Sequence, residues 1–216
     1  MTTLAPPPRA RFVPDRRYSI REWLAIEEAT GERYEYHDGQ LVSVRAMAGG
    51  TFAHALLIGN VTHVLGMGVR RMAHPDGSPR TECNVLSSDL RLAARSRERY
   101  VYPDAAIVCG APTYDAVVTT AVVNPVCVVE VTSKSSADLD IGEKFDWYAE
   151  LDTLRDYVIV HHRRRAVEVR SRRDAGADWV TQLYTASAAE VPLVGLGFGV
   201  SLAEVYRNWE PPKRAA

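Results

Sequence analysis

Two acidic residues interrupt apolar, strand-like runs of this 216-residue chain. Glu130 lies within residues 126–131, the most apolar run in the sequence, and Asp104 follows Pro103 inside residues 100–109. Burying a carboxylate is costly unless a partner or a cation compensates its charge. Glu130 could simply pair with an arginine, and Asp104 could accept backbone hydrogen bonds at a strand edge. Because the two runs are expected to pair as neighbouring strands, together they predict a hard oxygen site of the kind that Mg²⁺ selects.

Two further residues fit the same site. Glu35 lies between two tyrosines in a strand-like segment, and the alternative is a solvent-facing strand residue. Lys144 is one of three lysines in the chain and falls in the first turn of an expected helix, where a basic residue opposes the helix dipole. An inward Lys144 could orient a nucleophilic water or stabilise a phosphate. The alternative is a surface lysine whose stem covers apolar neighbours.

The elements that must position these residues follow the order helix, hairpin, long helix, several strands, helix and further strands. This order predicts an α/β (α+β) fold with a central mixed β-sheet flanked by helices. The expected segments are a helix over 19–29 with a Ser19–Glu22 capping box, a hairpin over 33–45 with its turn at Asp38-Gly39, a helix over 51–69 capped by Thr51, strands over 81–93, 100–109 and 126–131, a helix from a capping-box-like start at 140–143 to 151, a hairpin over 157–170 with its turn at 161–165, a strand over 179–184 and a short helix over 200–206.

The composition fits one globular domain. Hydrophobic residues make up 46% of the chain, enough for a sizeable core, and charged residues make up 25%. The formal net charge of −1 excludes a wholly basic nucleic-acid coat but permits local basic patches. We expect a proline-rich tail over residues 1–14, one domain over 15–210 and a C-terminal tail over 211–216.

The sequence also bears on the cellular compartment. Residues 1–10 lack the apolar segment of a signal peptide, and no apolar stretch is expected to reach the length of a membrane span. Cys83, Cys109 and Cys127 are expected to be buried, reduced thiols of a cytoplasmic protein. A glycine-rich phosphate loop, zinc-type Cys/His spacing and a nucleophile elbow are all missing from the sequence, so it does not support those chemistries.

A series of short motifs resembles the Uma2 (DUF820) family, in order, over about residues 18–172. The motifs are Tyr34-Glu35-Tyr36-His37-Asp38-Gly39, Ala48-Gly49-Gly50 followed by His54, Ser87-Ser88-Asp89-Leu90-Arg91, Tyr102-Pro103-Asp104, Val129-Glu130-Val131-Thr132-Ser133 and Gly142-Glu143-Lys144-Phe145-Asp146-Trp147-Tyr148. Each motif alone is weak, but the set is specific. The resemblance implies the restriction-endonuclease-like, PD-(D/E)XK fold.

The same resemblance implies roles for individual residues. Asp104 matches the motif aspartate, Glu130 the second acid and Glu35 the preceding glutamate of the superfamily. The lysine expected two residues after the second acid is Thr132 here, and Lys144 matches the helical lysine thought to replace it. Lys134 is the rival candidate, with a solvated loop lysine as its ordinary interpretation.

Other residues of these motifs are open to two interpretations. His54 is expected to face the sheet, where it could contact a phosphate or a site carboxylate, or be a structural histidine. For Asp89, an ion pair with Arg91 is the preferred interpretation. The remaining basic residues have two equal interpretations: they could form basic rims that bind a polyanion, or they could lie in solvated turns. These residues are Arg70, Arg71, Arg91, Arg95, Arg97, Arg99 and residues 161–165.

These observations lead to one function and two alternatives. The leading hypothesis is a metal-dependent nuclease that hydrolyses phosphodiester bonds of DNA or RNA, with Mg²⁺ or Mn²⁺ held by Asp104 and Glu130 and assistance from Lys144 and Glu35. The second is a non-catalytic module of the same fold that binds nucleic acid or a protein partner, an alternative that Thr132 keeps open. The third is a structural protein in which Glu130 is a buried ion pair. Nucleases of this kind often dimerise, so a homodimer is an open expectation.

Overall fold

The computed structural model describes residues 12–44, 51–72, 82–94, 98–133 and 142–211. Its main feature is a six-stranded mixed sheet with the order β10-β9-β8-β7-β6-β3. Only β7 and β8 pair in parallel within this sheet, and every other neighbouring pair is antiparallel. The strands are β3 (Cys83–Ser87), β6 (Ala105–Cys109), β7 (Cys127–Val131), β8 (Asp156–Val160), β9 (Val167–Ser171) and β10 (Val180–Tyr184).

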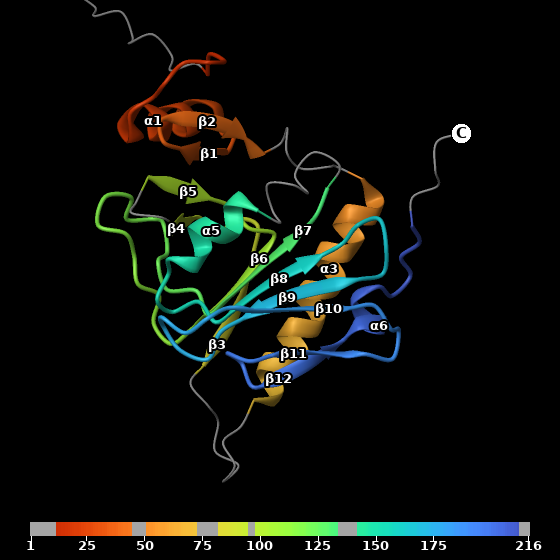
Figure 1. Ribbon diagram of the computed structural model, residues 1–216. Helices are drawn as coiled ribbons and strands as arrows, with labels where there is room; N and C mark the ends of the chain where they lie inside the picture. The colour runs from red at the N-terminus through yellow and green to blue at the C-terminus, as the bar shows by residue number, and fades with distance from the viewer. Residues whose placement is uncertain (1–11, 45–50, 73–81, 95–97, 134–141, 212–216) are drawn as a thin grey trace, which may run out of the picture.

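A second, antiparallel sheet with the order β2-β1-β5-β4 lies next to the main sheet (Figure 1). Helix α1 (Ile20–Thr30) packs against it through Trp23 and Ile26. The strands are β1 (Tyr34–His37), β2 (Gln40–Ser43), β4 (Leu92–Ala94) and β5 (Arg99–Val101). The expected capping box of α1 is confirmed, because Ser19 and Glu22 exchange both bonds. The expected turn at Asp38-Gly39 is also confirmed, and both residues have positive φ, as a two-residue hairpin turn requires.

Two strands expected to be continuous are each divided between the two sheets. Residues 100–109 form β5 and β6, which are separated at Tyr102-Pro103-Asp104, because Pro103 lacks the N–H that a ladder needs. Residues 81–93 contain β3 and the start of β4, with a turn between them. Asp104 is therefore at a sheet junction, directly before β6.

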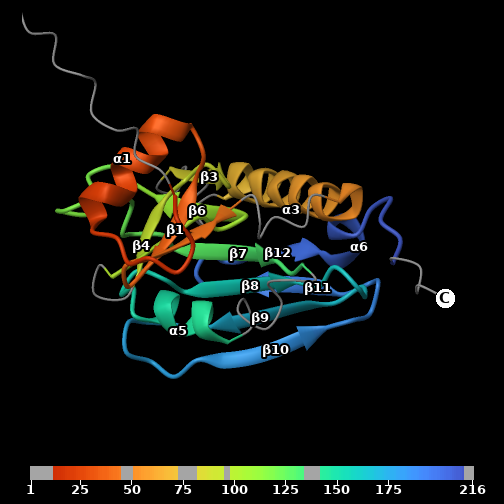
Figure 2. The same cartoon turned by 90° about the horizontal axis from the view of Figure 1, so that it is seen from above.

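Helices cover the two faces of the main sheet, as Figure 2 shows from above. On one face lies α3 (Phe52–Arg71), capped by Thr51 as expected, together with the hairpin of β11 (Glu190–Leu193) and β12 (Phe198–Ser201) and helix α6 (Leu202–Val205). On the other face lies α5 (Glu143–Ala149), packed through Trp147 and Tyr148. The β11–β12 hairpin was not expected from sequence.

The alternation of β7 divides its side chains between these two cores. Val129 and Val131 belong to the core that contains α3, whereas Val128 belongs to the core that contains α5. Period-two alternation therefore places Glu130 on the α5 face. All five residues of β7 are buried, as expected for a central strand covered on both sides.

Helix α3 meets the length and hydropathy criteria of a membrane span, with a mean hydropathy of 1.4 over its most apolar window. The expectation that no apolar stretch reaches this length is therefore wrong. Leu57, Val61 and Leu65 nevertheless pack into the core against the sheet. A helix that lies along one face of a sheet meets the same two criteria, so length and composition alone do not make α3 a span.

The cysteines correct another expectation. Cys83 and Cys109 face each other across β3 and β6 and form a disulfide, with a Cα–Cα separation of 3.9 Å. Cys127 is a buried free thiol, as expected. The bond was not visible in the sequence, because only the pairing register of β3 against β6 brings the two sulfurs together. The disulfide also gives no support to a reducing, cytoplasmic location, which remains a prediction.

Candidate active site

Glu130 faces helix α5 from the middle of the main sheet. Its Oε1 accepts hydrogen bonds from Lys144 Nζ at 3.2 Å and from the Tyr148 hydroxyl at 3.1 Å. The residue is only 3% exposed. The cost of burying this carboxylate is therefore offset by a cation and a neutral donor from successive turns of one helix. The partner is a lysine, and not the arginine of the ordinary interpretation.

Glu35 reaches the same lysine from the second sheet. Its Oε1 lies 3.4 Å from Lys144 Nζ and accepts the backbone N–H of Tyr102 at 3.2 Å, while His37 Nε2 lies 2.9 Å from Oε2. Glu35 is fully buried, so the solvent-facing alternative is wrong. Burial alone would raise the pKa of Glu35, but the charge of Lys144 and the contact with His37 outweigh it and hold that pKa below its ordinary value.

Lys144 thus joins two acids that are 95 positions apart in the sequence. It lies in the first turn of α5 with its side chain 5% exposed, so the surface-lysine interpretation is wrong. The N-cap of α5 is Gly142, which makes no side-chain cap bond, in place of the expected capping box. Lys144 is therefore placed by its contacts with Glu35 and Glu130, and not by helix stability. Lys134, its rival, lies outside the described residues.

Asp104 approaches the same strand from the sheet junction. Its Oδ2 accepts the backbone N–H of Val131 at 2.7 Å, directly after Glu130. Its side chain is 18% exposed, so it is more accessible than either glutamate. Ala105 pairs with Val129, so the expected pairing of the two strand-like runs is confirmed, although Asp104 itself lies directly before β6 and not on it. The expected hard oxygen site, in which the two carboxylates would share one cation, stays a prediction.

His54 reaches this place from the first turn of α3, as the sequence predicted for a residue facing the sheet. Its Nε2 lies 2.9 Å from the carbonyl oxygen of Val131 and 3.9 Å from Asp104 Oδ2. A carbonyl oxygen only accepts, so this bond places the proton on Nε2. His54 therefore fixes the carboxyl end of β7 on the α3 side, while Asp104 fixes the same residue through its N–H.

Three residues of this region were not recognised as part of the site from sequence. Tyr148 was identified only as a member of the apolar face of its helix, and the i, i+4 spacing from Lys144 could have shown that both reach one carboxylate. Burial raises the pKa of Tyr148 well above its ordinary value, and Glu130 and Glu35 raise it further. His37, which contacts Glu35, was quoted only as part of a motif. His162 contacts Thr132 and had no sequence signal beyond its place in a turn.

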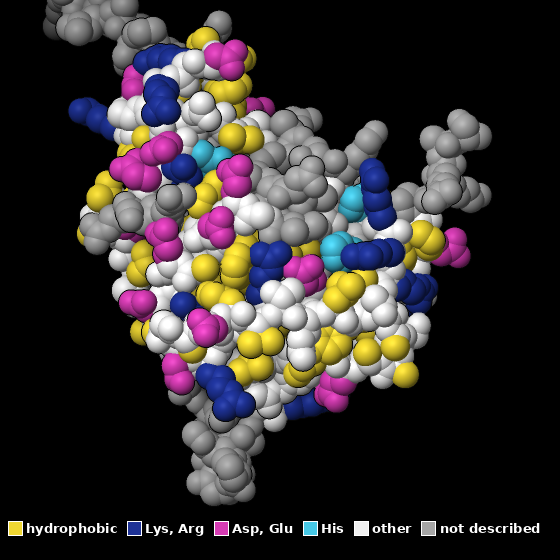
Figure 3. Space-filling view, in the orientation of Figure 1, with side chains coloured by type: hydrophobic (Ala, Val, Ile, Leu, Met, Phe, Trp, Pro, Cys, Tyr) yellow, Lys and Arg dark blue, Asp and Glu magenta, His cyan; other side chains and the backbone are white. Residues whose placement is uncertain are grey.

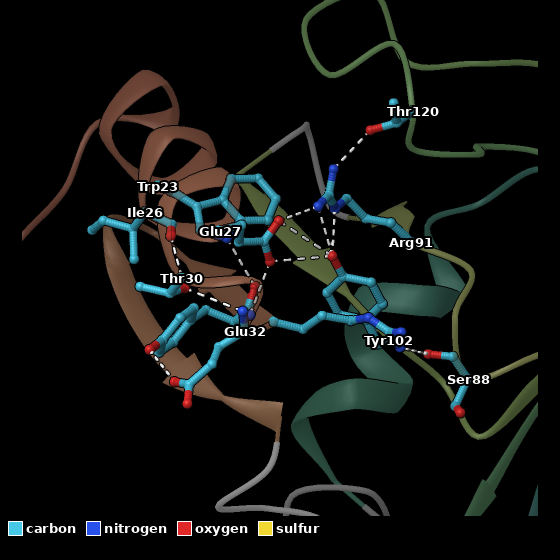
Figure 4. Close-up of polar contacts among 11 residues, drawn as sticks. Trp23, Ile26, Glu27, Thr30, Glu32, Ser88, Arg91, Tyr102 and Thr120 are labelled. Atoms are coloured by element: carbon cyan, nitrogen blue, oxygen red, sulfur yellow. Dashed lines mark hydrogen bonds and ion pairs between the residues drawn. The ribbon is translucent and has the colours of Figure 1, made fainter. Parts of the chain in front are cut away.

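The hydroxyl of Tyr102 contacts two charged side chains, Arg91 and Glu27 (Figure 4). Its hydroxyl accepts a hydrogen bond from Arg91 Nε at 2.9 Å and donates to Glu27 Oε1 at 3.2 Å. Arg91 also forms an ion pair with Glu27. Burial raises the pKa of Tyr102 to about 12. This cluster fixes the residue that donates to Glu35 and lies two positions before Asp104.

The preferred pairing of Asp89 with Arg91 is wrong. Asp89 forms an ion pair with Arg33 at 2.5 Å, and Arg91 pairs with Glu27. The two residues lie on the short segment that leads into β4, and their side chains meet α1 and the start of β1 instead of each other. Arg91 is thereby removed from the candidate basic rims, because its charge is balanced inside the protein.

A candidate metal centre here would rest on two carboxylates. Among the described residues there is no group of three or more His, Cys, Asp or Glu side chains arranged to hold a metal ion. Asp104 and Glu130 are hard oxygen donors, and Mg²⁺ often binds through one or two carboxylates while keeping several waters. The donor chemistry therefore fits Mg²⁺ or Mn²⁺ better than a zinc site with a full set of protein ligands.

The fold and the placement of these residues define a restriction-endonuclease-like protein, with a mixed sheet, an acid before one central strand, a glutamate on the next and a lysine on the following helix. A solved structure described as a putative nuclease belonging to DUF820, from Anabaena variabilis, has the same fold with a TM-score of 0.60. The match covers 82% of this chain and 91% of that one, at 12% sequence identity.

The chain belongs to the Uma2 family, described as putative restriction endonuclease, whose model matches residues 4–204. The uncharacterized protein slr1290 of Synechocystis is 31% identical over 196 residues, covering 90% of this chain and 94% of that protein. The uncharacterized protein sll1609 of the same organism is 29% identical over 139 residues, covering 64% and 72%. The resemblance inferred from the sequence motifs is therefore confirmed at the level of family and fold.

Proposed function

We propose that this protein is a Mg²⁺- or Mn²⁺-dependent nuclease that hydrolyses phosphodiester bonds of nucleic acid. The observation that carries the proposal is the buried ammonium group of Lys144 between Glu35 and Glu130. The more exposed Asp104 accepts the N–H of Val131, the residue that follows Glu130. Lys144 of α5 joins an acid of the second sheet to an acid of the main sheet, and Asp104 lies at the junction between the two sheets. A structural ion pair would need only one acid and one base, and this arrangement has more.

Asp104 and Glu130 would hold the divalent cation in this proposal. When bound, such a cation would acidify a water and neutralise negative charge on the phosphate in the transition state. Asp104 is oriented for this role by the N–H of Val131, and Glu130 by Lys144 and Tyr148. Each acid therefore has a hydrogen-bonded support that limits its rotation, which a preorganised site requires.

Lys144 would position the attacking water or contact the scissile phosphate. Its placement between two acids keeps the ammonium group beside the site without an external counter-ion. Glu35 would act through Lys144, because it is fully buried and contacts that ammonium group directly. Glu35 is therefore a positioning residue in this proposal, and Lys144 the group closest to the phosphate.

A non-catalytic binding module of the same fold is the second candidate. One observation favours it: Thr132 occupies the place of the superfamily lysine, and its hydroxyl is engaged with His162 instead of the site. In that case the carboxylates would have a structural role, and nucleic acid or a protein would bind without cleavage.

Cleavage and metal binding separate the two candidates. Labelled single- and double-stranded DNA and RNA would be incubated with the full chain in Mg²⁺, in Mn²⁺ and in EDTA. We expect metal-dependent cleavage that Asp104→Asn and Glu130→Gln each reduce by at least 100-fold, with cooperative unfolding retained. The exposed control Glu204→Gln should cleave as wild type does.

Calorimetric titration with Mn²⁺ gives a readout that does not depend on activity. Wild type and Glu204→Gln should bind Mn²⁺, and Asp104→Asn should not. Binding to nucleic acid without cleavage by any metal would reject the nuclease in favour of the binding module. Metal-dependent cleavage that survives in Asp104→Asn would show that the catalytic site lies elsewhere.

A further inference from the structure

The turn between β8 and β9 carries five consecutive basic or titratable residues, His161-His162-Arg163-Arg164-Arg165. The three arginines are exposed and the two histidines are partly buried. In Figure 3, histidine and basic side chains lie side by side on the right of the molecule, where Figure 1 shows this turn. The chain as a whole has a formal net charge of −1, so this concentration of positive charge is local.

Hydrogen bonds connect the turn to the carboxyl end of β7, next to the candidate active site. Thr132 Oγ1 accepts the backbone N–H of His162 at 3.1 Å and lies 3.1 Å from its Nδ1. The backbone N–H of Thr132 donates to the carbonyl oxygen of Val160 at 2.9 Å. Thr132 lies two positions after Glu130 and one after Val131, which Asp104 and His54 both contact. The basic turn is thus tied directly to the strand that carries the acid.

The base of the turn is also fixed. The Tyr206 hydroxyl donates to the carbonyl oxygens of His161 and Ala166 at 2.7 and 2.6 Å. Arg165 donates to the carbonyl oxygen of Trp209 at 2.9 Å, so this arginine has a structural role. Arg163 and Arg164 are the two members of the turn that project without such a bond among the described residues.

Neither Arg163 nor Arg164 forms an ion pair within the part of the chain that the structure describes. The nearby Glu168, whose charge opposes the lowering of the His161 pKa, is itself paired with Arg170. Burial lowers the pKa of His162, and the positive groups Arg163, His54 and His161 lower it further. A group of uncompensated cations on a fixed turn favours an anionic ligand.

We propose that this turn, residues 161–165, binds the sugar–phosphate backbone of a nucleic-acid strand beside the scissile phosphate, with Arg163 and Arg164 as phosphate contacts and Thr132 as the residue that positions the turn. The inference rests on the proposed function because it assigns the substrate-binding surface of that site. Thr132 then has a definite role: where the superfamily has its lysine, this chain has the hydroxyl that fixes its basic turn. Backbone contacts of this kind carry no sequence information, so the turn contributes affinity and register.

The chain offers a matched control for charge. Arg70 and Arg71 are adjacent and exposed, and lie in the last turn of α3. His54 lies in the first turn of the same helix, about 25 Å away at 1.5 Å per residue. Each double variant therefore removes two positive charges. Arg163→Ala/Arg164→Ala removes them beside the site, and Arg70→Ala/Arg71→Ala removes them far from it.

The test is binding of a labelled oligonucleotide to the full chain in EDTA over a series of salt concentrations. We expect Arg163→Ala/Arg164→Ala to weaken binding at least tenfold at low salt. The slope of log affinity against log salt should become shallower by about 1.4 for a single strand or 1.8 for a duplex, since each lost phosphate contact removes about 0.7 or 0.9. Arg70→Ala/Arg71→Ala should bind within twofold of wild type. Equal weakening by both double variants, or by neither, would overturn the proposal.

Thr132 provides a second test. Thr132→Ser keeps the hydroxyl and should bind as wild type does, whereas Thr132→Val removes it and should weaken binding about tenfold. If Thr132→Val does not fold, the arginine pair alone decides. Wild-type binding without cleavage, but with the expected response to the arginine pair, would uphold this inference and reject the nuclease. Metal-dependent cleavage that is undiminished in Arg163→Ala/Arg164→Ala would uphold the nuclease and reject this inference.

Discussion

The ammonium nitrogen of Lys144 lies 3.2 Å from Oε1 of Glu130 and 3.4 Å from Oε1 of Glu35. This contact joins β1 of the second sheet, β7 of the main sheet and helix α5. All three side chains are at most 5% exposed, so water screens the interaction weakly. The same lysine therefore contributes both to stability and to the proposed chemistry.

Replacing Lys144 with methionine should lower the free energy of unfolding by about 3–5 kcal/mol, because two buried carboxylates lose their cation. The pKa of Glu35 should rise, since Lys144 is the leading group that holds it down. Denaturant titration measures the first effect, and a carboxyl-resolved NMR titration measures the second. Lys134→Ala should change neither stability nor cleavage. An inactive Lys134→Ala beside an active Lys144→Met would reverse the assignment of the basic residue.

The effect of Glu35→Gln should depend on pH. The pKa of folded Glu35 lies below its ordinary value, so the ionised group stabilises the folded state above the unfolded pKa of about 4.3, and this contribution is lost as pH falls through the folded pKa. We expect the variant to be about 3 kcal/mol less stable at pH 7, the cost of leaving a buried ion pair incomplete. The difference from wild type should shrink below about pH 4. Unfolding curves from pH 3 to 8 measure it, and a difference that stays constant would exclude ionised Glu35 as the cause.

Tyr148→Phe removes a hydroxyl that donates to Glu130 and leaves the ring packing intact. The free energy of unfolding should fall by about 1 kcal/mol, as for a buried hydrogen bond. Cleavage should fall about tenfold, less than for loss of either acid, because the hydroxyl only orients Glu130. The control Tyr184→Phe removes a hydroxyl bonded to Gln182 at the exposed edge of the sheet and should be silent. Wild-type cleavage by Tyr148→Phe would show that this hydroxyl is not needed to orient Glu130.

The disulfide predicts a stability effect that depends on redox conditions. Cys83 and Cys109 are separated by 26 residues, and closing a loop of that length should add about 3.5 kcal/mol in the chain-entropy model. Thiol labelling in denaturant without reductant should detect one thiol, that of Cys127, and three after reduction. Cys83→Ala/Cys109→Ala should be less stable by about that amount and insensitive to reductant. Three labelled thiols before reduction would show that the pair is reduced in the isolated protein.

Local elements were predictable because their signals are short-range. The capping box at Ser19, the Asp38-Gly39 turn, the cap at Thr51 and the apolar strand around Glu130 are each determined by residues a few positions apart. The division of residues 100–109 into two strands was missed, although Pro103 marks it, because the residues on both sides of the break are apolar. The β11–β12 hairpin was missed although its apolar residues alternate, because Pro192 and Gly199 lie inside its strands and weaken the strand signal.

The sequence by itself determined the family, the mixed sheet and the types of residue that carry charge near its centre. Tertiary structure decided which residues meet. Lys144 contacts both glutamates, Arg91 pairs with Glu27, and Cys83 forms a disulfide with Cys109. These partners are far apart in the chain, and strand register and helix rotation bring them together. A buried charge must find a partner, but the sequence does not say which of many arginines, lysines and acids that partner is. The packing of α5 against β7, and of the second sheet against both, made that choice.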